Sequence, residues 1–217
     1  MENKKTFNIH NALAFGWHTT KDNLGTLLLI TIITIAVSAL FNFFGGKSIL
    51  LSVVSFLVST YIGIMWIHIS LAYAKRQPVK LNSMWTGITA HQFWVYVLAS
   101  ILYSLLVMIG IVLLIIPGFI FLTTYVFYSY NIIDHNAGVR LSFRESSTMT
   151  KGNRWKILGF ILVLALVNVV GALLFGVGLL FTIPMTSIAL AFVYHDLSNT
   201  NVVDTTVVET TENYSKL

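Results

Sequence analysis

The chain has 217 residues and a mass of 24.2 kDa, a length that would suit one soluble domain. Its composition excludes that class, because 56% of the residues are hydrophobic and only 10% are charged, against about 45–50% and about 25% in soluble domains. The net charge is +5. The absence of cysteine excludes disulfides, thiolate chemistry and cysteine-bound metals.

The charged residues leave four long uncharged runs. These runs contain 24, 27, 53 and 39 residues and cover positions 23–46, 48–74, 81–133 and 157–195. A helix needs roughly 20 mostly apolar residues to cross a bilayer, so each of the two longest runs has room for two crossings. The sequence therefore predicts an all-α fold, a polytopic membrane helix bundle with six transmembrane helices. No signal-peptide pattern precedes them, so the first crossing is expected to direct insertion.

Glycine and proline mark where the two longest runs divide. Pro117 and Gly118 interrupt the 53-residue run, and proline is accepted in the first turn of a helix but breaks its interior. Gly176 and Gly178 interrupt the last run, and Pro184 is expected to kink the helix that follows. The predicted spans cover about residues 24–44, 49–74, 93–115, 117–133, 155–175 and 179–194.

The Lys and Arg residues predict the orientation of these spans. With six spans, 12 of the 13 lie on one side of the membrane and Lys47 alone lies on the other. Because basic loops stay in the cytoplasm, both termini are expected there. This basic face is expected to contact anionic lipid headgroups, not nucleic acid. Residues 198–217 are rich in Thr, Val and Glu without an apolar period, which predicts a flexible cytoplasmic tail.

A moderately polar segment precedes each expected pair of spans. Ile9, Leu13 and Trp17 recur every four residues, and positions 81–88 have the same helical period, which is typical of a helix lying on a membrane surface. The period is weaker at 137–143. Similar motifs also open the spans, with TKDN at 20–23 before the first and TKGN at 150–153 before the fifth. We interpret these features as an internal repeat of an interfacial helix followed by a transmembrane hairpin. The alternative is that Trp, Thr and Lys are simply common at membrane borders. The repeats cover about residues 7–75, 79–134 and 137–197 of one membrane domain, 1–197.

Several of these motifs carry a resemblance to known proteins. They are the sequence GIVLLIIPG at 110–118, Asp134 at the end of a span, LSFRES at 141–146 and TKGNRW at 150–155. Over about residues 9–197, the chain resembles a large group of small bacterial multi-pass membrane proteins of unknown function. That group is similar to the membrane domain attached to some glycerophosphodiester phosphodiesterases. The resemblance implies a bacterial inner-membrane protein, and it implies no phosphodiesterase activity because this chain lacks that catalytic domain.

Ionisable residues at the ends of two spans are the first candidates for a functional site. Asp134 with His135, and His195 with Asp196, each end a span on the expected cytoplasmic side. They could form a proton relay, since ionisable groups at membrane depth are usually functional, or they could simply reach interfacial water. Arg140 follows Asp134 by six residues and is a candidate partner for its carboxylate.

Asn168 is the remaining polar candidate, near the middle of the fifth span. An amide in hydrocarbon needs a hydrogen-bond partner, which favours a contact between helices over a contact with a substrate. No metal-binding histidine pair, phosphate loop or nucleophile elbow occurs in the sequence. No catalytic residue, cofactor or metal site is therefore predicted.

These observations favour a non-catalytic membrane scaffold or accessory component. The alternative is a small-solute or lipid transporter or channel, which the repeats and the prolines within spans would suit. A lipid-directed enzyme would have only Asp134 and Asp196 as carboxylates at the inner face. A protein partner or a homo-oligomer is compatible with the sequence, and no pattern identifies one.

Overall fold

The computed structural model describes residues 6–45, 49–77, 88–113, 115–174 and 176–214. Within these ranges every regular element is an α-helix and no strand occurs, which confirms the all-α prediction. The helices, in chain order, are α1 (Ile9–Asp22), α2 (Leu24–Gly45), α3 (Ile49–Ala74), α5 (Ala90–Leu113), α6 (Ile115–Tyr125), α7 (Tyr128–His135), α8 (Val139–Thr150), α9 (Arg154–Leu173) and α10 (Leu179–Tyr214).

Six helical segments in the described ranges are long and apolar enough to cross a membrane, as the charge-free runs predicted. Each agrees with a predicted span to within a few residues at most of its ends. The segments are Leu24–Phe41, Ile49–Ala74, Ala90–Leu113, Ile116–His135, Arg154–Leu173 and Leu179–Asn199.

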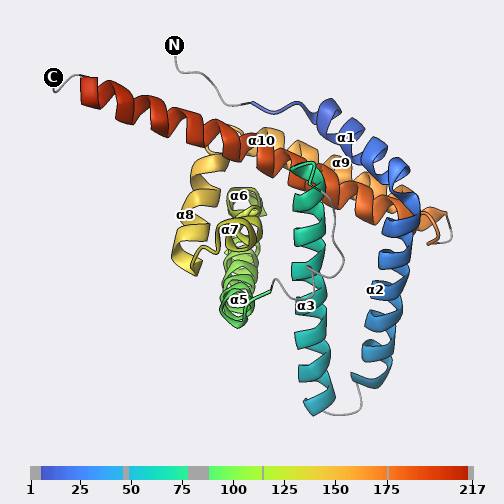
Figure 1. Cartoon of the computed structure of the whole chain (residues 1–217). Helices are drawn as coiled ribbons and strands as arrows, with labels where there is room; N and C mark the ends of the chain where they lie inside the picture. The colour runs from blue at the N-terminus through green and yellow to red at the C-terminus, as the bar shows by residue number, and fades with distance from the viewer. Residues whose placement is uncertain (1–5, 46–48, 78–87, 114, 175, 215–217) are drawn as a thin grey trace.

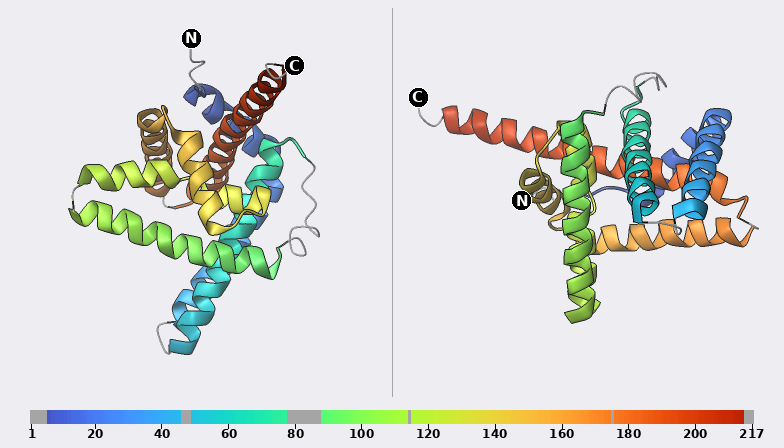
Figure 2. Two further views of the ribbon diagram at one scale, coloured as in Figure 1. Left: turned by 90° about the vertical axis from the view of Figure 1, so that its left-hand side faces the viewer. Right: turned by 90° about the horizontal axis from the view of Figure 1, so that it is seen from below.

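Successive apolar helices pack in pairs, α2 with α3, α5 with α6, and α9 with α10. Figures 1 and 2 show that the three pairs point in three different directions instead of lying parallel to one another. We call the end of each pair where its two helices are joined the tip, and the opposite end the base. The sequence predicted a helix bundle but no angle between the pairs, because an apolar pattern identifies lipid-facing surfaces without fixing that angle.

The predicted helix at 9–17 is present as α1, and it continues to Asp22. Asn8 caps its first turn, since the Asn8 Oδ1 atom accepts a hydrogen bond of 2.9 Å from the backbone N–H of His10. α1 lies alongside α10, and α2 begins near the start of α10 (Figure 1). The close approach depends on Gly16, where an added Cβ would lie 2.6 Å from the carbonyl oxygen of Met185. The surface position of α1 stays a prediction.

The other two predicted interfacial segments have different outcomes. Most of the segment at 81–88 falls outside the described residues, which resume at Ile88. The weak pattern at 137–143 belongs to α8, which buries Ser142, Phe143 and Ser146 on one side. The alternation of apolar residues there does not produce a strand.

The predicted fourth span, 117–133, is broken into α6 and α7. Hydroxyl groups of α8 cause the break, because Ser146 Oγ and Thr150 Oγ1 donate to the carbonyl oxygen of Thr124 at 2.9 and 3.2 Å. Ser146 Oγ also accepts from the backbone N–H of Phe127 at 3.2 Å. These contacts satisfy backbone groups at the break, which therefore costs little.

α10 continues well beyond the predicted sixth span, to Tyr214. Pro184 lies inside the helix without ending it. The flexibility and the cytoplasmic position expected for residues 198–217 stay predictions.

The turn between α9 and α10 uses two glycines that the sequence singled out. Gly176 has a φ of 77°, a left-handed conformation that side chains disfavour. At Gly178 an added Cβ would lie 2.5 Å from the carbonyl oxygen of Gly171. The α5–α6 tip is equally close, since a Cβ on Gly118 would lie 2.8 Å from the backbone nitrogen of Ile111. Pro117 occupies the first turn of α6, as its helix preference predicts.

Candidate functional site

An ion pair between α3 and α7 forms the centre of the candidate site. The Lys75 ammonium group, just after α3, contacts the Asp134 carboxylate near the end of α7. The side chain of Asp134 is 10% exposed and that of Lys75 is 30% exposed. Both charges have lost much of their water, so each depends on the other for compensation.

α10 joins this ion pair through a tyrosine. The Tyr194 hydroxyl shares its hydrogen bond between Asn131 Oδ1 at 3.1 Å and Asp134 Oδ2 at 3.3 Å. Asn131 is completely buried, and its Nδ2 donates to the Ser142 carbonyl of α8 at 3.3 Å. Helices α3, α7, α8 and α10 are therefore connected by polar contacts around one carboxylate.

Two histidines lie beside Asp134. His135 Nε2 is 3.6 Å from Asp134 Oδ2, while His135 Nδ1 is 3.7 Å from Glu145 Oε2 of α8. His68 of α3 is close enough to Asp134 to interact electrostatically, and its buried Nε2 atom has no hydrogen-bond partner within the described residues. We refer to the connected residues as the polar junction, which comprises Lys75, Asn131, Asp134, His135, Glu145 and Tyr194.

Aromatic rings cover the polar junction on its inner side. Tyr194 stacks on Tyr130 with ring centroids 5.2 Å apart and meets Phe127 at 5.9 Å. Phe127, Tyr130 and Tyr194 belong to one buried hydrophobic core of the described residues. Because these rings exclude water, the hydrogen bonds of the junction act in a low-dielectric environment.

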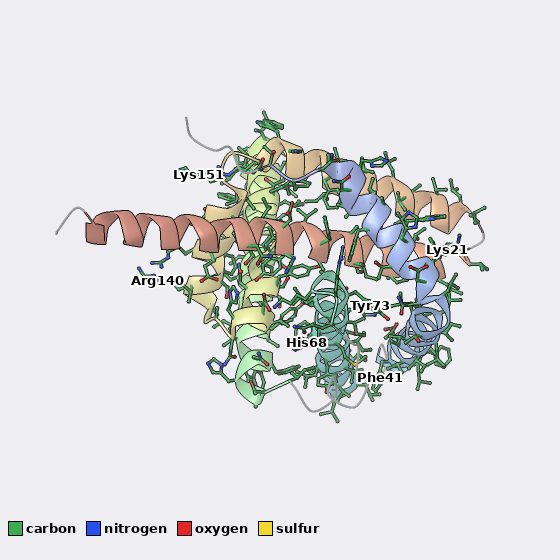
Figure 3. All side chains as sticks on the ribbon, turned by 45° about the horizontal axis from the view of Figure 1, so that its top comes forward. Lys21, Phe41, His68, Tyr73, Arg140 and Lys151 are labelled. Atoms are coloured by element: carbon green, nitrogen blue, oxygen red, sulfur yellow. The ribbon has the colours of Figure 1, made fainter. Side chains whose placement is uncertain are left out.

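Asp134 was predicted as a site residue, but its predicted partner is wrong. In the described chain, Asp134 contacts Lys75, His135 and Tyr194. Arg140 is exposed on α8, at the edge of the molecule in Figure 3. His195 lies 3.2 Å from Asn199 on its own helix, and Asp196 is exposed. A proton relay that combines these groups stays a prediction.

Sequence reasoning missed Lys75, Asn131, Glu145 and Tyr194. A signal for Lys75 was present, because it ends the second predicted span just as Asp134 ends the fourth, on the same expected face. No comparable signal marked Asn131 or Tyr194, since one amide and one hydroxyl among many polar groups do not reveal a pairing. Within the described residues, no three His, Asp or Glu side chains are grouped closely enough to hold a metal ion.

Asn168 lies outside the polar junction and connects α9 with α10. Its Nδ2 atom donates to Thr186 Oγ1 at 3.2 Å, and Thr186 donates in turn to the Thr182 carbonyl at 2.8 Å. The Oδ1 atom of Asn168 is buried without a partner in the described chain. The contact supports a packing role for this amide within the α9–α10 pair.

Asn168→Ala is expected to lower the free energy of unfolding by about 0.6–2 kcal/mol, because the contact with Thr186 is lost. Asn168→Leu should lower it further, since a larger side chain would push α10 away from α9. Thermal unfolding of the purified protein in detergent measures both effects. If both variants melt like the wild type and instead alter solute flux across reconstituted vesicles, Asn168 lines a transport path and the packing role is wrong.

Over its described residues the chain is all-helical, with six helical segments long and apolar enough to cross a membrane, and the polar junction connects α3, α7, α8 and α10. The chain belongs to a family described as a domain of unknown function (DUF7847), which matches residues 80–211. The match includes α5 to α9, most of α10 and every residue of the polar junction except Lys75. It gives no link to glycerophosphodiester phosphodiesterases. No curated protein and no solved structure matches the chain.

Proposed function

We propose that the chain is a polytopic membrane protein whose six apolar helices enter the bilayer as three hairpins, and that it acts as a non-catalytic scaffold or accessory component. One observation carries the membrane location. Exposed apolar side chains cover the tips of all three pairs, with Ile49 86%, Val112 80% and Leu173 76% exposed. So much contiguous apolar surface is unfavourable in water and favourable in lipid.

Tryptophan side chains support the position of the membrane–water boundary. Trp94 and Trp155 are exposed near the first residues of α5 and α9, at the bases of those two pairs, and Trp17 is exposed on α1. Tryptophan prefers the headgroup region, because its ring is apolar while its N–H needs a polar partner. With the bases at one boundary, the tips extend toward the opposite leaflet.

The basic residues support a cytoplasmic position for the bases and both termini, as the positive-inside rule predicts. The resemblance to small bacterial membrane proteins adds the bacterial inner membrane to the proposal. The similarity to the membrane domain attached to some phosphodiesterases is retained as a hypothesis about fold, without a catalytic role.

The divergence of the pairs is compatible with a bilayer. α3 has 26 residues, which corresponds to a length of about 39 Å, whereas the hydrocarbon core is about 30 Å thick. Helices longer than the core tilt within it. Three tilted hairpins joined at the polar junction would cover a wide area of the membrane. The junction would also keep the hairpins at fixed distances from one another, which suits a scaffold.

The α9–α10 hairpin has a constraint that the other two lack. Trp17 of α1 contacts Phe181 at the start of α10, with ring centroids 4.9 Å apart. The last residues of α1, which include the exposed Lys21 and Asp22, therefore lie beside the first turns of α10. Because these two side chains are charged, this part of the hairpin must stay in contact with water. We propose that this hairpin enters the membrane obliquely, and that its tip stays short of the far surface. Because a hairpin returns to the side it came from, the C-terminus stays cytoplasmic.

The scaffold role is tested by affinity capture of the tagged full chain from native membranes, with co-purifying proteins identified by mass spectrometry. We expect one protein partner in near-stoichiometric amounts that an unrelated tagged membrane protein does not capture. The contradictory result is no partner, together with selective solute flux across vesicles that contain the purified chain alone. That result would assign the transporter function.

A further inference from the structure

A cleft between the end of α1 and the end of α3 lies on the opposite side of α3 from His68. Its volume is about 600 Å³, and its walls include Phe15, His18, Asp22, Tyr73, Arg76 and Gln77. None of the residues that line the cleft belongs to the polar junction, and Figure 3 shows His68 and Tyr73 on different sides of α3. Its volume is in the range of small-molecule sites in proteins.

The cleft presents one positive and one negative charge. Lys75 is committed to Asp134, while the adjacent Arg76 has no ion-pair partner among the described residues. Asp22 likewise has none in the described part of the chain. Arg76 and Asp22 line the same cleft without pairing with each other, so both charges face a ligand of complementary charge.

The backbone holds Arg76 in an uncommon conformation. Its φ of 54° is in the left-handed region, and glycine or asparagine usually occupies such a position after a helix. Hydrogen bonds fix this turn, since the N–H of Gln77 donates to the Ala72 carbonyl at 2.8 Å and the N–H of Arg76 donates to the Tyr73 carbonyl at 3.0 Å. An unfavourable backbone conformation at a residue with a long basic side chain is typical of a position where that side chain makes a functional contact.

We propose that this cleft binds the headgroup of a zwitterionic aminophospholipid. The Arg76 guanidinium would bind the phosphate, for which its fork of donors is suited, and the Asp22 carboxylate would accept from the primary ammonium group. Phe15 and Tyr73 provide apolar surface for the glycerol and the start of the acyl chains. The site lies where α1 ends and α3 ends, at the boundary that the proposed function assigns to headgroups, and it rests on that function.

The charge balance of the cleft argues against the two common alternatives. A phosphatidylglycerol would place the same phosphate on Arg76 but has no cationic group, so the Asp22 carboxylate would be left without a counter-charge. A phosphatidylcholine has a quaternary ammonium group that cannot donate a hydrogen bond to the carboxylate. Phosphatidylethanolamine supplies both a phosphate and a primary ammonium group, so it matches both side chains.

The proposal is tested by native mass spectrometry of the full chain with phosphatidylethanolamine, phosphatidylcholine and phosphatidylglycerol of identical acyl chains. We expect the wild type to bind phosphatidylethanolamine most tightly. Arg76→Gln should weaken this binding about tenfold, as expected for loss of one charge-assisted hydrogen bond. Asp22→Asn should abolish the preference over phosphatidylglycerol. Arg140→Gln removes an exposed arginine outside the cleft and should change neither affinity.

Three results would overturn the proposal. They are equal binding of phosphatidylglycerol by the wild type, unchanged binding by Arg76→Gln, and full displacement of the lipid by soluble glycerophosphoethanolamine. The last result would make a free phosphodiester the ligand. Alkaline carbonate extraction of membranes separates this proposal from the proposed function. If the wild type resists extraction but the lipid test fails, only the cleft proposal is wrong, whereas release of the wild type contradicts the membrane location.

Discussion

Asp134→Asn is expected to lower the free energy of unfolding by about 2–3 kcal/mol. Asparagine has nearly the same shape as aspartate, so the change removes the charge while it preserves the packing of α7. The Lys75 ammonium then stays in a partly desolvated site without its counter-charge, and breaking a buried ion pair in this way costs several kcal/mol. Solvent screens part of that cost, because the Lys75 side chain is 30% exposed. Denaturant or thermal unfolding of the full chain in detergent measures the effect.

A second substitution distinguishes the ion pair from a general effect at position 134. In the double variant Asp134→Asn with Lys75→Met, we expect much of the lost stability to return, because neither charge is left unpaired. Arg140→Gln is the matched control for an exposed charge and should change stability by less than about 0.5 kcal/mol. If Asp134→Asn is as stable as the wild type, the polar junction does not hold the helix pairs together.

Gly16→Ala is expected to lower the free energy of unfolding by about 1–3 kcal/mol, through overpacking between α1 and α10. The added Cβ would lie 2.6 Å from the Met185 carbonyl oxygen and 3.0 Å from the Ala189 Cβ. Backbone atoms of α10 cannot move aside as a flexible side chain would, so α1 must shift away. The same unfolding measurement in detergent detects the change.

Gly159→Ala is the control for the intrinsic effect of replacing a helical glycine. Gly159 lies within α9, and a Cβ there meets nothing within 4 Å. Alanine is a better helix former than glycine, so this variant should be more stable by about 0.5–1 kcal/mol. If Gly16→Ala and Gly159→Ala both raise the free energy of unfolding, or both lower it, the close contact between α1 and α10 is contradicted.

The sequence predicted the elements that depend on local composition. Long charge-free runs gave the six apolar helices, and the pair Gly176 and Gly178 marked the α9–α10 turn, because a left-handed φ and a close backbone approach both favour glycine. The period from Ile9 to Trp17 likewise predicted α1, whereas the cap at Asn8 was found only in the structure.

The sequence did not predict features that depend on contacts between distant residues. Asp134 pairs with Lys75, 59 residues away, instead of the nearby Arg140, because the packing of α3 against α7 brings the two charges together. The break between α6 and α7 depends on hydroxyls of Ser146 and Thr150, more than 20 residues later in the chain. Apolar periodicity does not indicate which distant residues form such contacts, and it does not indicate the angle between helix pairs.

Cysteine labelling in intact cells tests whether the three hairpins enter the membrane from one side. The chain has no natural cysteine, so each single substitution reports one position. With a membrane-impermeant maleimide, we expect Ile49→Cys and Val112→Cys to react from outside. Gln77→Cys and Lys151→Cys should react only after permeabilisation, and Val177→Cys at the oblique tip should not react from outside. Reaction of the tip positions 49 and 112 on the same side as positions 77 and 151 would show that the hairpins do not cross the membrane from that side.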